Sequence, residues 1–477
     1  MLGIVFPHQL FAEIPKEWTA IQFVRHDIGY GGKATTVRNF HVARKVFLRA
    51  AEAAWLDHVK AKYPKVKVDV RKRGEAWGTK DACQIWDPVD RMLEAESKKK
   101  CPKATLLPTP AFVLSKEEAT SMLGTKDKLS HTGFYGEMRR KTGILMANGK
   151  PLGGKLRYDE ENREKIPKGA VLPAWDKEVD LRQSPYIAAA AKEIQSEGPS
   201  LGEWVDLVFP TTHQGAQKAL DRFVRTRLAK FGPYEDAIVE DEGGDFLYHS
   251  VLSAVINVGL LTPVEVLETV VAYGKSHKIP LSSLEGFVAQ LLGWREYMRA
   301  VYIRFPTAPA DRLGHRRSLG PSWYEGTTGL LPVDTAIARV RENAYLHHIE
   351  RLMIVGNAMF LAQIRPTEVY RWFMEMFADS WDWVMVGNVY YMSQWASDAI
   401  TTKPYISSSA YVLRMSDYGK GGWCAAWDAL YWTTIHRHAA LIKKNYRMAA
   451  QVSFWEKKSA ADKKAIQQQA EAALRHL

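Results

Sequence analysis

The stretch LGIVFPHQLFAEIPKEWTAIQFVR, residues 2–25, decides the architecture of the first part of the chain. Residues 2–6 and 20–25 are short apolar runs separated by polar turns, so each predicts a buried strand. Apolar residues then return at helical spacing between 37 and 59, and strand-like runs follow at 66–70 and 104–107. This order of elements predicts a layered α/β domain over residues 1–130. No GxGxxG motif follows the first strand, so the domain has no fingerprint of dinucleotide binding.

The chain changes character twice after this domain. Residues 143–200 are rich in Gly, Pro and Lys, as in GKPLGGK at 149–155, which predicts an irregular connector within residues 131–212. From about residue 213 the pattern becomes helical, and several of the predicted helices carry Pro near the first turn. These helices are predicted at 217–230, 247–259, 263–275, 284–302, 332–359, 366–377 and 459–477. We therefore expect an all-helical second domain over residues 213–477.

Composition narrows the class of protein. In 477 residues, 46% are hydrophobic and 25% are charged, which excludes intrinsic disorder for the bulk of the chain. The net charge of +12 favours a polyanion such as nucleic acid as partner. Cys83, Cys101 and Cys424 show no CxxC spacing, which is typical of a reducing compartment. Without a signal peptide or an apolar run of about 20 residues, the sequence predicts a soluble, cytoplasmic protein with no membrane partner.

Aromatic residues and a histidine pair are the first candidates for chemistry. Ten of the sixteen tryptophans fall after residue 290, which fits either aromatic filling of a helical core or a stacked planar cofactor with electron-transfer neighbours. His347 and His348 are adjacent on a predicted helix, where successive residues point about 100° apart, so only one can easily face a pocket. A hydrogen-bonded core histidine is the alternative. No third ligand lies nearby at metal spacing, so we expect no metal site.

Polar residues near a predicted helix start are the second candidates. In HSVLS, residues 249–253, two serines lie one turn apart, where free backbone N–H groups and hydroxyls suit a phosphate or simply cap the helix. The basic strings RRK at 139–141 and HRR at 315–317, with Arg222, Arg225 and Lys230, either contact DNA phosphates or form solvated faces. The positive net charge favours DNA contact for some of them.

Ten short sequence strings between residues 134 and 418 follow one another in the same order as in a known protein family. They are FYGEMRRKTGILM (134–146), PLGGK (151–155), ENR (161–163), FGPYEDA (231–237), HSVLS (249–253), GWREYM (293–298), HHIERLM (347–353) with GN (356–357), RWFM (371–374), TKPY (402–405) and MSDY (415–418). On these strings the chain resembles the photolyase and cryptochrome family, and closely its prokaryotic branch of deoxyribodipyrimidine photolyase-related proteins. The studied members of that branch are bacterial (6-4) photolyases that carry an iron-sulfur cluster.

The resemblance implies a Rossmann-like antenna domain followed by an all-helical domain that binds FAD. In such enzymes blue light excites the reduced flavin, and an electron passes to a pyrimidine lesion that is flipped out of UV-damaged DNA and later returns. The protein supplies binding, orientation and electrostatics while the cofactor carries the chemistry. The resemblance therefore implies a light-driven DNA repair lyase, which we expect to be a monomer. A cryptochrome-like photoreceptor and a helical DNA-binding module with a vestigial flavin site are the alternatives.

The resemblance also assigns roles by motif. His249, Ser250 and Ser253 hold the FAD phosphates and ribose; Gln290, Trp294 and Arg295 lie between flavin and lesion; Asn357 and Asn388 contact the cofactor. Members that repair (6-4) photoproducts use a histidine as proton donor, and His348, with His347 beside it, matches that position. A cyclobutane dimer needs no such acid, so the pair favours the (6-4) substrate, with the dimer as the alternative lesion. For DNA contact the string at 139–141 supplies Arg139, Arg140 and Lys141.

Three features depart from the family pattern. Trp372 matches the electron-relay tryptophan, but Phe373 replaces a frequent Tyr and Tyr324 stands where Trp is common, so photoreduction by this route is expected to be weak. The four cysteines that hold the cluster in the family correspond here to Pro332, Gly419, Gly422 and the vicinity of Ala425, and Cys424 is the only thiol close by. We therefore predict that the chain carries no iron-sulfur cluster. We expect Trp423, Trp427 and Trp432 to fill the space that the cluster would occupy. The pattern for a lumazine antenna is blurred, and Asp27 and His41 are the only candidates for it.

Overall fold

The computed structural model describes the chain except for residues 33–36, 38, 176–183 and 204–206. Its N-terminal part contains a parallel sheet of five short strands, whose connections cross over from one strand to the next. The strands are β1 (Leu2–Val5), β2 (Ala20–Val24), β3 (Lys67–Arg71), β4 (Cys83–Trp86) and β5 (Ala104–Leu107), in the order β3-β2-β1-β4-β5. Leu2 pairs with Ala20 on one side and with Cys83 on the other, so β1 lies at the centre of the sheet.

Helices complete this α/β domain. They are α1 (Asp27–Tyr30), α2 (Val42–Lys62), α3 (Arg91–Lys100) and α4 (Lys116–Leu123). Phe23 of β2 and Trp55 of α2 have ring centroids 5.6 Å apart, which packs the long helix on the sheet. The sequence did not predict β4, whose CQIW stretch includes the polar Gln84, or α3, which buries only Leu93 and Ser97. Cys83 and Cys101, far apart in sequence, are buried neighbours: burial and the adjacent Cys101 thiol raise the pKa of Cys83 to about 12.

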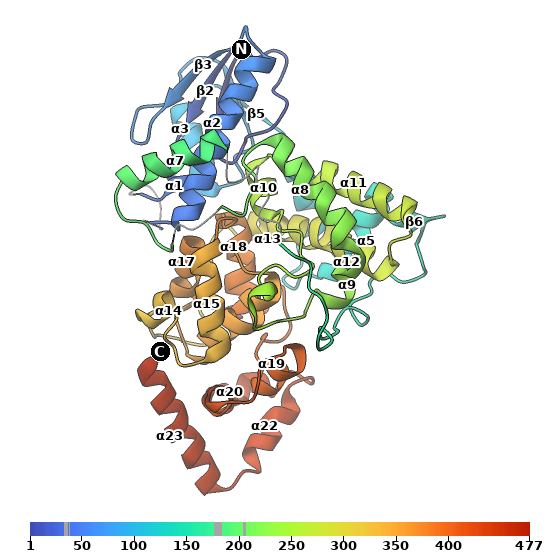
Figure 1. The fold of residues 1–477 in the computed structure, drawn as a ribbon, viewed down its shortest axis with the longest axis vertical. Coiled ribbons are helices and arrows are strands. Elements are labelled where there is room, and N and C mark those ends of the chain that lie inside the picture. The colour runs from blue at the N-terminus through green and yellow to red at the C-terminus, as the bar shows by residue number, and fades with distance from the viewer. Residues whose placement is uncertain (33–36, 38, 176–183, 204–206) are drawn as a thin grey trace.

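The connector is more regular than the sequence predicted. It contains α5 (His131–Thr142), the hairpin strands β6 (Met146–Ala147) and β7 (Lys150–Pro151), and α7 (Pro185–Ser196). The prediction of irregular structure is wrong for α7, a helix that begins at a Pro and packs along α2. Arg49 of α2 forms ion pairs with Glu193 of α7 and with Glu197, the residue just after that helix. The connector therefore joins the α/β domain instead of only crossing its surface (Figure 1).

The remainder of the chain is helical, so the predicted fold class is confirmed (Figure 1). The elements are α8 (His213–Thr226), α9 (Leu228–Tyr234), η1 (Glu242–Gly244), α10 (Ser253–Val258), α11 (Pro263–Ser276), α12 (Leu281–Val288), η2 (Ala289–Arg295), α13 (Glu296–Arg304), α14 (Ser322–Glu325), α15 (Leu331–Asn343), η3 (Glu350–Gly356), α16 (Asn357–Leu361), α17 (Pro366–Met376), α18 (Asp382–Met385), η4 (Val386–Ser393), α19 (Ser409–Met415), α20 (Gly422–Arg437), α21 (Ala439–Ile442), α22 (Ala449–Glu456) and α23 (Ala460–His476). The predicted continuous helix over 332–359 is wrong, because the chain leaves the helix at Ala344, whose φ of 50° is left-handed.

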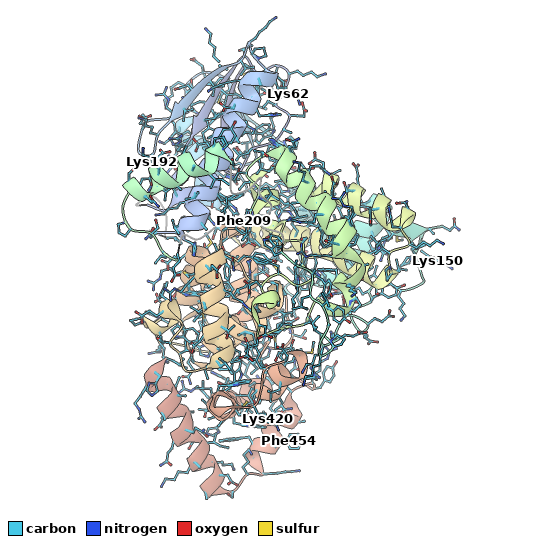
Figure 2. All side chains as sticks on the ribbon, in the orientation of Figure 1. Lys62, Lys150, Lys192, Phe209, Lys420 and Phe454 are labelled. Atoms are coloured by element: carbon cyan, nitrogen blue, oxygen red, sulfur yellow. The ribbon has the colours of Figure 1, made fainter. Side chains whose placement is uncertain are left out.

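Three elements of the helical domain, η2, η3 and η4, are π-helical segments. Each widens a helix by one residue per turn, and such segments are frequent at functional sites. Phe209 lies buried at the junction with the α/β domain, where its ring contacts Phe47 of α2 and Tyr345 of the helical domain at 5.5 and 6.4 Å (Figure 2). No helix in the described part of the chain is long and apolar enough to cross a membrane. The described residues contain no group of three metal-ligating side chains.

Candidate cofactor and substrate cavity

A cavity of about 460 Å³ lies where the three π-helical segments meet, since residues of η2, η3 and η4 all line it. It brings together residues that are more than a hundred positions apart in sequence. Its wall includes these residues with predicted roles: His249, Ser250, Ser253, Gln290, Trp294, Arg295, His348, Phe373 and Asn388. The predicted flavin and lesion residues thus converge, apart from Asn357 and His347.

A buried polar network supports the wall at the start of α10. The hydroxyl of Ser253 donates to Oδ2 of Asp379 at 2.6 Å, and the guanidinium of Arg351 donates to both oxygens of the same carboxylate at 2.8 and 3.0 Å. Asn257 donates its amide to the backbone carbonyl of Asp379 at 2.7 Å and accepts from Arg295. Sequence motifs did not reveal Asp379, Arg351 or Asn257, because none of them belongs to a spacing that predicts a ligand site.

The structure separates the two adjacent histidines. His348 is accessible to solvent and lines the cavity, whereas His347 is fully buried behind it. The ring of His347 stacks on that of His249 at 4.6 Å and 5°, and its Nε2 lies 3.2 Å from Oε2 of Glu350, close enough for an ion pair but not aligned for a hydrogen bond. His347 therefore supports the wall, and only His348 can meet a bound molecule.

Behind His347 lies a chain of buried charges. Arg339 donates to Oε1 of Glu350 at 2.6 Å and forms an ion pair with Asp245 at 2.8 Å. Burial raises the pKa of Glu350 to about 7, although Arg339 opposes the shift. Burial, and then the neighbouring His249 and cations, lower the pKa of His347. Removing either partner of the Arg339–Glu350 pair should be costly, because a buried charge is then left without a counter-charge.

Burial lowers the pKa of His348 to about 4, and the adjacent Arg351 lowers it further. The ordinary value for histidine is about 6.5. Between these values the unfolded chain binds a proton that the folded chain does not, so protonation favours unfolding. The contribution of neutral His348 to stability is therefore fully present above pH 6.5 and is lost as the pH falls toward 4.

The lowered pKa of His348 predicts a loss of stability at low pH that can be measured. Between pH 7.5 and 5, wild-type protein should lose more free energy of unfolding than the variant His348→Gln, which has no group to protonate. Because the imidazole is accessible through the cavity, solvent screens the effect, and we expect a difference of about 1 kcal/mol. Urea unfolding at both pH values measures it. Equal losses in the two proteins would contradict the lowered pKa.

Trp294 forms a flat wall that another histidine holds in place. Its ring stacks on that of His131 at 3.7 Å and 14°. Arg157 donates to Nδ1 of His131 at 3.0 Å, and burial followed by this cation lowers the pKa of His131 to about 3. The imidazole is therefore neutral at pH 7 and packs on the indole as an uncharged ring. Trp383 also lines the cavity, with the guanidinium of Arg295 4.8 Å from its ring centroid.

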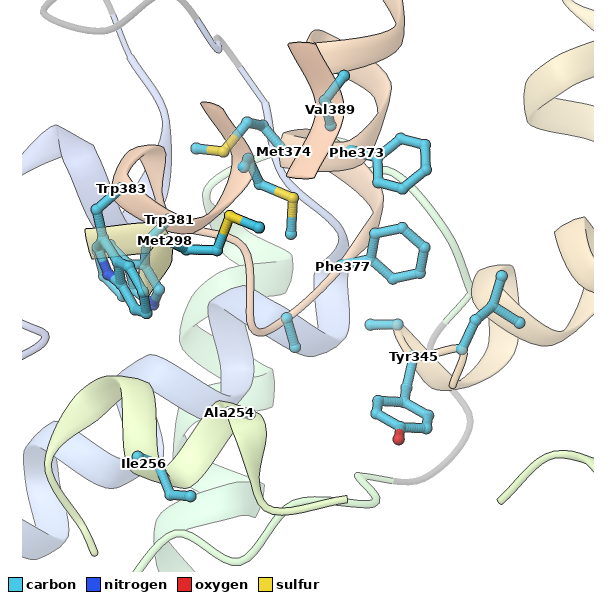
Figure 3. Packing of buried hydrophobic residues seen from close by; sticks show 14 of the residues in the cluster. Ala254, Ile256, Met298, Tyr345, Phe373, Met374, Phe377, Trp381, Trp383 and Val389 are labelled. Atoms are coloured by element: carbon cyan, nitrogen blue, oxygen red, sulfur yellow. The ribbon is translucent and has the colours of Figure 1, made fainter. Parts of the chain in front are cut away.

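The predicted electron-relay residues lie one behind another. Phe373 lines the cavity, and Figure 3 shows its ring beside that of Phe377, with the centroids 5.4 Å apart. Trp372 is fully buried, with its ring centroid 5.5 Å from that of Phe373. The indole of Trp372 donates to the backbone carbonyl of Trp323 at 2.9 Å, and the next residue, Tyr324, donates its hydroxyl to Glu375 at 2.7 Å. The side chain nearest the cavity is thus the phenyl ring, which is the hardest of them to oxidise.

This order predicts that the variant Phe373→Tyr is photoreduced faster than wild-type protein, because a phenol is more easily oxidised than a phenyl ring. The measurement is the bleaching of oxidised flavin absorbance under blue light with an external reductant. Trp372→Phe serves as the opposite variant and should slow photoreduction in either background. If Phe373→Tyr and wild type bleach at the same rate, electrons reach the cavity by another route.

Asn357 and His41 have structural roles. Asn357 is fully buried and outside the cavity wall, and its amide donates to Oγ of Ser407 at 2.9 Å. His41 caps α2, with Nδ1 accepting from Ala43 at 3.1 Å and Nε2 lying 2.7 Å from the carbonyl of Arg341. It is fully buried, so neither ring nitrogen is left for an antenna. Asp27 forms an ion pair with Arg73 at 3.2 Å.

The basic string at 139–141 divides in the structure. The prediction that Arg139 contacts DNA is wrong, because its side chain is fully buried and donates to the carbonyls of Ile144, Leu145 and Leu156. Arg140 and Lys141 are exposed; Arg140 pairs with Glu137, and Lys141 lies 2.7 Å from Glu118.

The positions that correspond to cluster cysteines lie at two helix starts. Pro332 opens α15, and Gly419, Gly422, Cys424 and Ala425 lie at or just before the start of α20. Trp423 and Trp427 are buried there with ring centroids 6.0 Å apart, and Trp427 donates to the carbonyl of Ser407 at 3.0 Å. Trp432 is only half-buried and lies under Lys458, so it does not share this space.

Comparison with known proteins gives matches to a family model, to curated relatives and to solved structures. The model of the deoxyribodipyrimidine photo-lyase-related protein family matches residues 4–204, which adds the α/β domain that the sequence strings do not reach. A (6-4) photolyase from Agrobacterium fabrum is 34% identical over 379 residues, covering 77% of this chain and 74% of that protein. Two solved structures share the fold: a bacterial class III photolyase from Agrobacterium tumefaciens (TM-score 0.52, 15% identity, covering 84% and 81%) and a cryptochrome from Synechocystis sp. PCC6803 (TM-score 0.59, 13% identity, covering 100% and 98%).

Proposed function

Because the chain belongs to the photolyase and cryptochrome family, in its deoxyribodipyrimidine photolyase-related branch, we propose that it is a light-driven DNA repair enzyme acting on (6-4) photoproducts. The observation that carries the proposal is the convergence of His348, Gln290 and Trp294 with a polar network on one cavity. A histidine that can deliver a proton and a flat aromatic wall are what a flipped (6-4) lesion requires.

The cavity residues fit FAD. A volume of about 460 Å³ lies within the range of roughly 300–1,000 Å³ found for small-molecule and cofactor sites. Nε2 of His249 is buried at the cavity with no hydrogen-bond partner among the described residues, so a bound polar group can satisfy it. Ser250 offers a hydroxyl and Arg295 a cation that suit a diphosphate. When bound and fully reduced, FAD supplies the photoexcited electron for repair.

Two amide side chains are available to orient bound groups. Gln290 donates only a long hydrogen bond of 3.4 Å to the carbonyl of Gly286, and Asn388 donates to the carbonyl of Val384 at 2.9 Å. Each amide therefore keeps its oxygen free to accept from a base or cofactor. Trp294, held by His131, presents an apolar ring against which an everted base can stack.

His348 supplies the proton that moves with the hydroxyl of the lesion. In the cavity as described its pKa is lowered to about 4, so the imidazole is neutral at pH 7. Negative charge that arrives with DNA and cofactor favours the protonated ring and offsets the effects of burial and of Arg351. The proton on the ring then passes to the hydroxyl that returns to the 5′ base.

The test compares two lesions in one assay. Reduced holoprotein is illuminated with an oligonucleotide carrying either a (6-4) photoproduct or a cyclobutane dimer, and the thymines are measured by chromatography. We expect light-dependent repair of the (6-4) photoproduct. Repair of the dimer alone would overturn the lesion assignment, and absence of repair with FAD bound would favour a photoreceptor.

We also propose that the chain carries no [4Fe-4S] cluster. Such a cluster needs four cysteine thiolates, and the whole chain has three, of which Cys83 and Cys101 are buried in the α/β domain. Purified protein should therefore contain iron and acid-labile sulfide far below one cluster per chain, as measured by elemental and colorimetric analysis. Near-stoichiometric amounts of both would contradict the proposal.

A further inference from the structure

Three cations from separate segments meet at one side of the cavity. Arg163 and Tyr405 line it, and Lys403 lies two residues before Tyr405. Asn445 donates its amide to the carbonyl of Thr402 at 2.6 Å, which fixes the loop carrying Arg447 against this segment. Burial lowers the pKa of Lys403, and the nearby Arg447 and Arg163 lower it further, as expected for cations that repel one another.

Two of these three cations, Lys403 and Arg447, are poorly compensated, whereas Arg163 lies near the carboxylate of Asp236. The neighbouring cations Lys155, Arg157 and Lys443 have carboxylates at 2.9, 2.9 and 3.3 Å. In contrast, no carboxylate of a described residue lies within ion-pair distance of Lys403 or Arg447. Holding like charges together without a counter-charge raises the energy of the free protein, and a bound anion reverses that effect. The cluster is therefore suited to an anionic partner.

An exposed aromatic side chain continues the cluster outward. Tyr446 is 82% exposed, yet it is held in place, because Arg447 donates to its hydroxyl at 2.8 Å and lies 5.4 Å from the ring centroid. Residues 437–464 around it contain eight Lys and Arg but only two Asp and Glu. A fixed, exposed ring within a basic surface is a platform on which a nucleic acid base can stack.

We propose that the DNA strand flanking the lesion runs from the cavity across Lys403 and Arg447, and that Tyr446 stacks on a nucleotide outside the lesion. The proposal rests on the proposed function, since it needs DNA at the cavity. It extends the contact surface to the turn between α21 and α22, where Tyr446 and Arg447 lie. The partner is a polyanion with stackable bases, which a free phosphate ion cannot replace.

The test measures binding of holoprotein in the dark to duplexes with and without a lesion, by fluorescence anisotropy at several salt concentrations. Arg447→Gln and Lys403→Gln should each reduce the slope of log affinity against log salt by about one, for both duplexes, because each removes one phosphate contact. Tyr446→Ala should weaken binding at least about fivefold, and Tyr446→Phe should weaken it less, because it keeps the ring and the contact of the ring with Arg447 while losing the hydroxyl. Lys192→Gln on α7, exposed and far from this surface, is the control and should leave the slope unchanged (Figure 2).

The outcomes separate this inference from the function on which it rests. If wild-type protein binds and repairs DNA but the salt-dependence slope is unchanged in Arg447→Gln and Lys403→Gln, the flanking strand does not run across these residues. The proposed function is then intact. If wild-type protein repairs no lesion but the salt-dependence slope still falls in both variants, the proposed function is overturned and the proposed DNA-binding surface stands. Each variant is checked for wild-type FAD content and for a wild-type circular dichroism spectrum. Inorganic phosphate is added to the binding assay as a second control, and if it weakens DNA binding equally in all proteins, the cluster is not merely a binding site for a phosphate ion.

Discussion

Replacing His348 with alanine is expected to slow repair of a (6-4) photoproduct at least about a hundredfold, because general acid catalysis contributes on the order of 10²–10⁴ in rate. His348 lines the cavity, whereas the adjacent His347 is fully buried behind it and cannot take over the role. FAD should remain bound, since the network of Ser253, Asp379 and Arg351 is untouched. The measurement is the initial rate of lesion loss under fixed illumination, with the flavin spectrum recorded for each preparation.

Two controls accompany this variant. His277→Ala, just after α11, removes an exposed imidazole that stacks on Tyr273 at 3.8 Å and lies outside the cavity wall, so repair should not change. Any activity on a cyclobutane dimer should also survive in His348→Ala, because splitting that lesion needs no acid. If His348→Ala repairs the (6-4) photoproduct at the wild-type rate, the proton comes from another group.

Replacing Asp379 with alanine is expected to lower the free energy of unfolding by about 3–5 kcal/mol and to release FAD, because the change leaves a buried cation without its partner. Asp379 is 5% exposed and accepts from Ser253 and twice from Arg351. Its loss also frees Ser253, which begins α10 at the cavity wall. Urea unfolding of the FAD-free protein and the flavin content after gel filtration measure the two effects separately.

The matched variants for Asp379→Ala test the cause. Asp379→Asn keeps an acceptor for Ser253 and should retain more FAD than Asp379→Ala, although it also loses the negative charge. Glu137→Gln breaks the exposed pair with Arg140 and should give no measurable change. Wild-type stability and wild-type FAD content in Asp379→Ala would show that the network is not what holds this wall.

The sequence strings predicted most of the cavity wall but not its shape. His249, Gln290 and Trp294 were assigned by motif and meet in the structure. The choice between His347 and His348 could not be made from sequence, because apolar spacing continues through 332–359 as if the helix were unbroken. The left-handed turn at Ala344, followed by a π-helical segment, decides which imidazole faces the cavity.

Residues that act through buried charge were the hardest to predict. Asp379 and Arg351 stand 28 positions apart with α16 and α17 between them, so no local spacing predicts their pairing. Arg139 and Arg140 are neighbours with the same chemistry, yet one is fully buried under three carbonyls and the other is exposed. Such differences depend on tertiary burial, which a local pattern of charges does not contain.

The α/β domain illustrates the limits of local periodicity. The two first strands and α2 were predicted because their apolar residues are numerous and regularly spaced. Strand β4 and helix α3 were missed, and α7 was taken as irregular because it lies in a segment rich in Gly, Pro and Lys. Tertiary contacts, such as the pairing of Arg49 with α7, stabilise elements that are weak on their own.

Heating the purified protein and measuring the flavin that it releases shows whether the cavity holds FAD. If the cavity lined by His249, Ser253 and Arg295 holds FAD, the supernatant contains FAD in stoichiometric amount, and Asp379→Ala protein releases much less. A colourless wild-type protein that releases no FAD and fails to take it up on reconstitution would contradict the account.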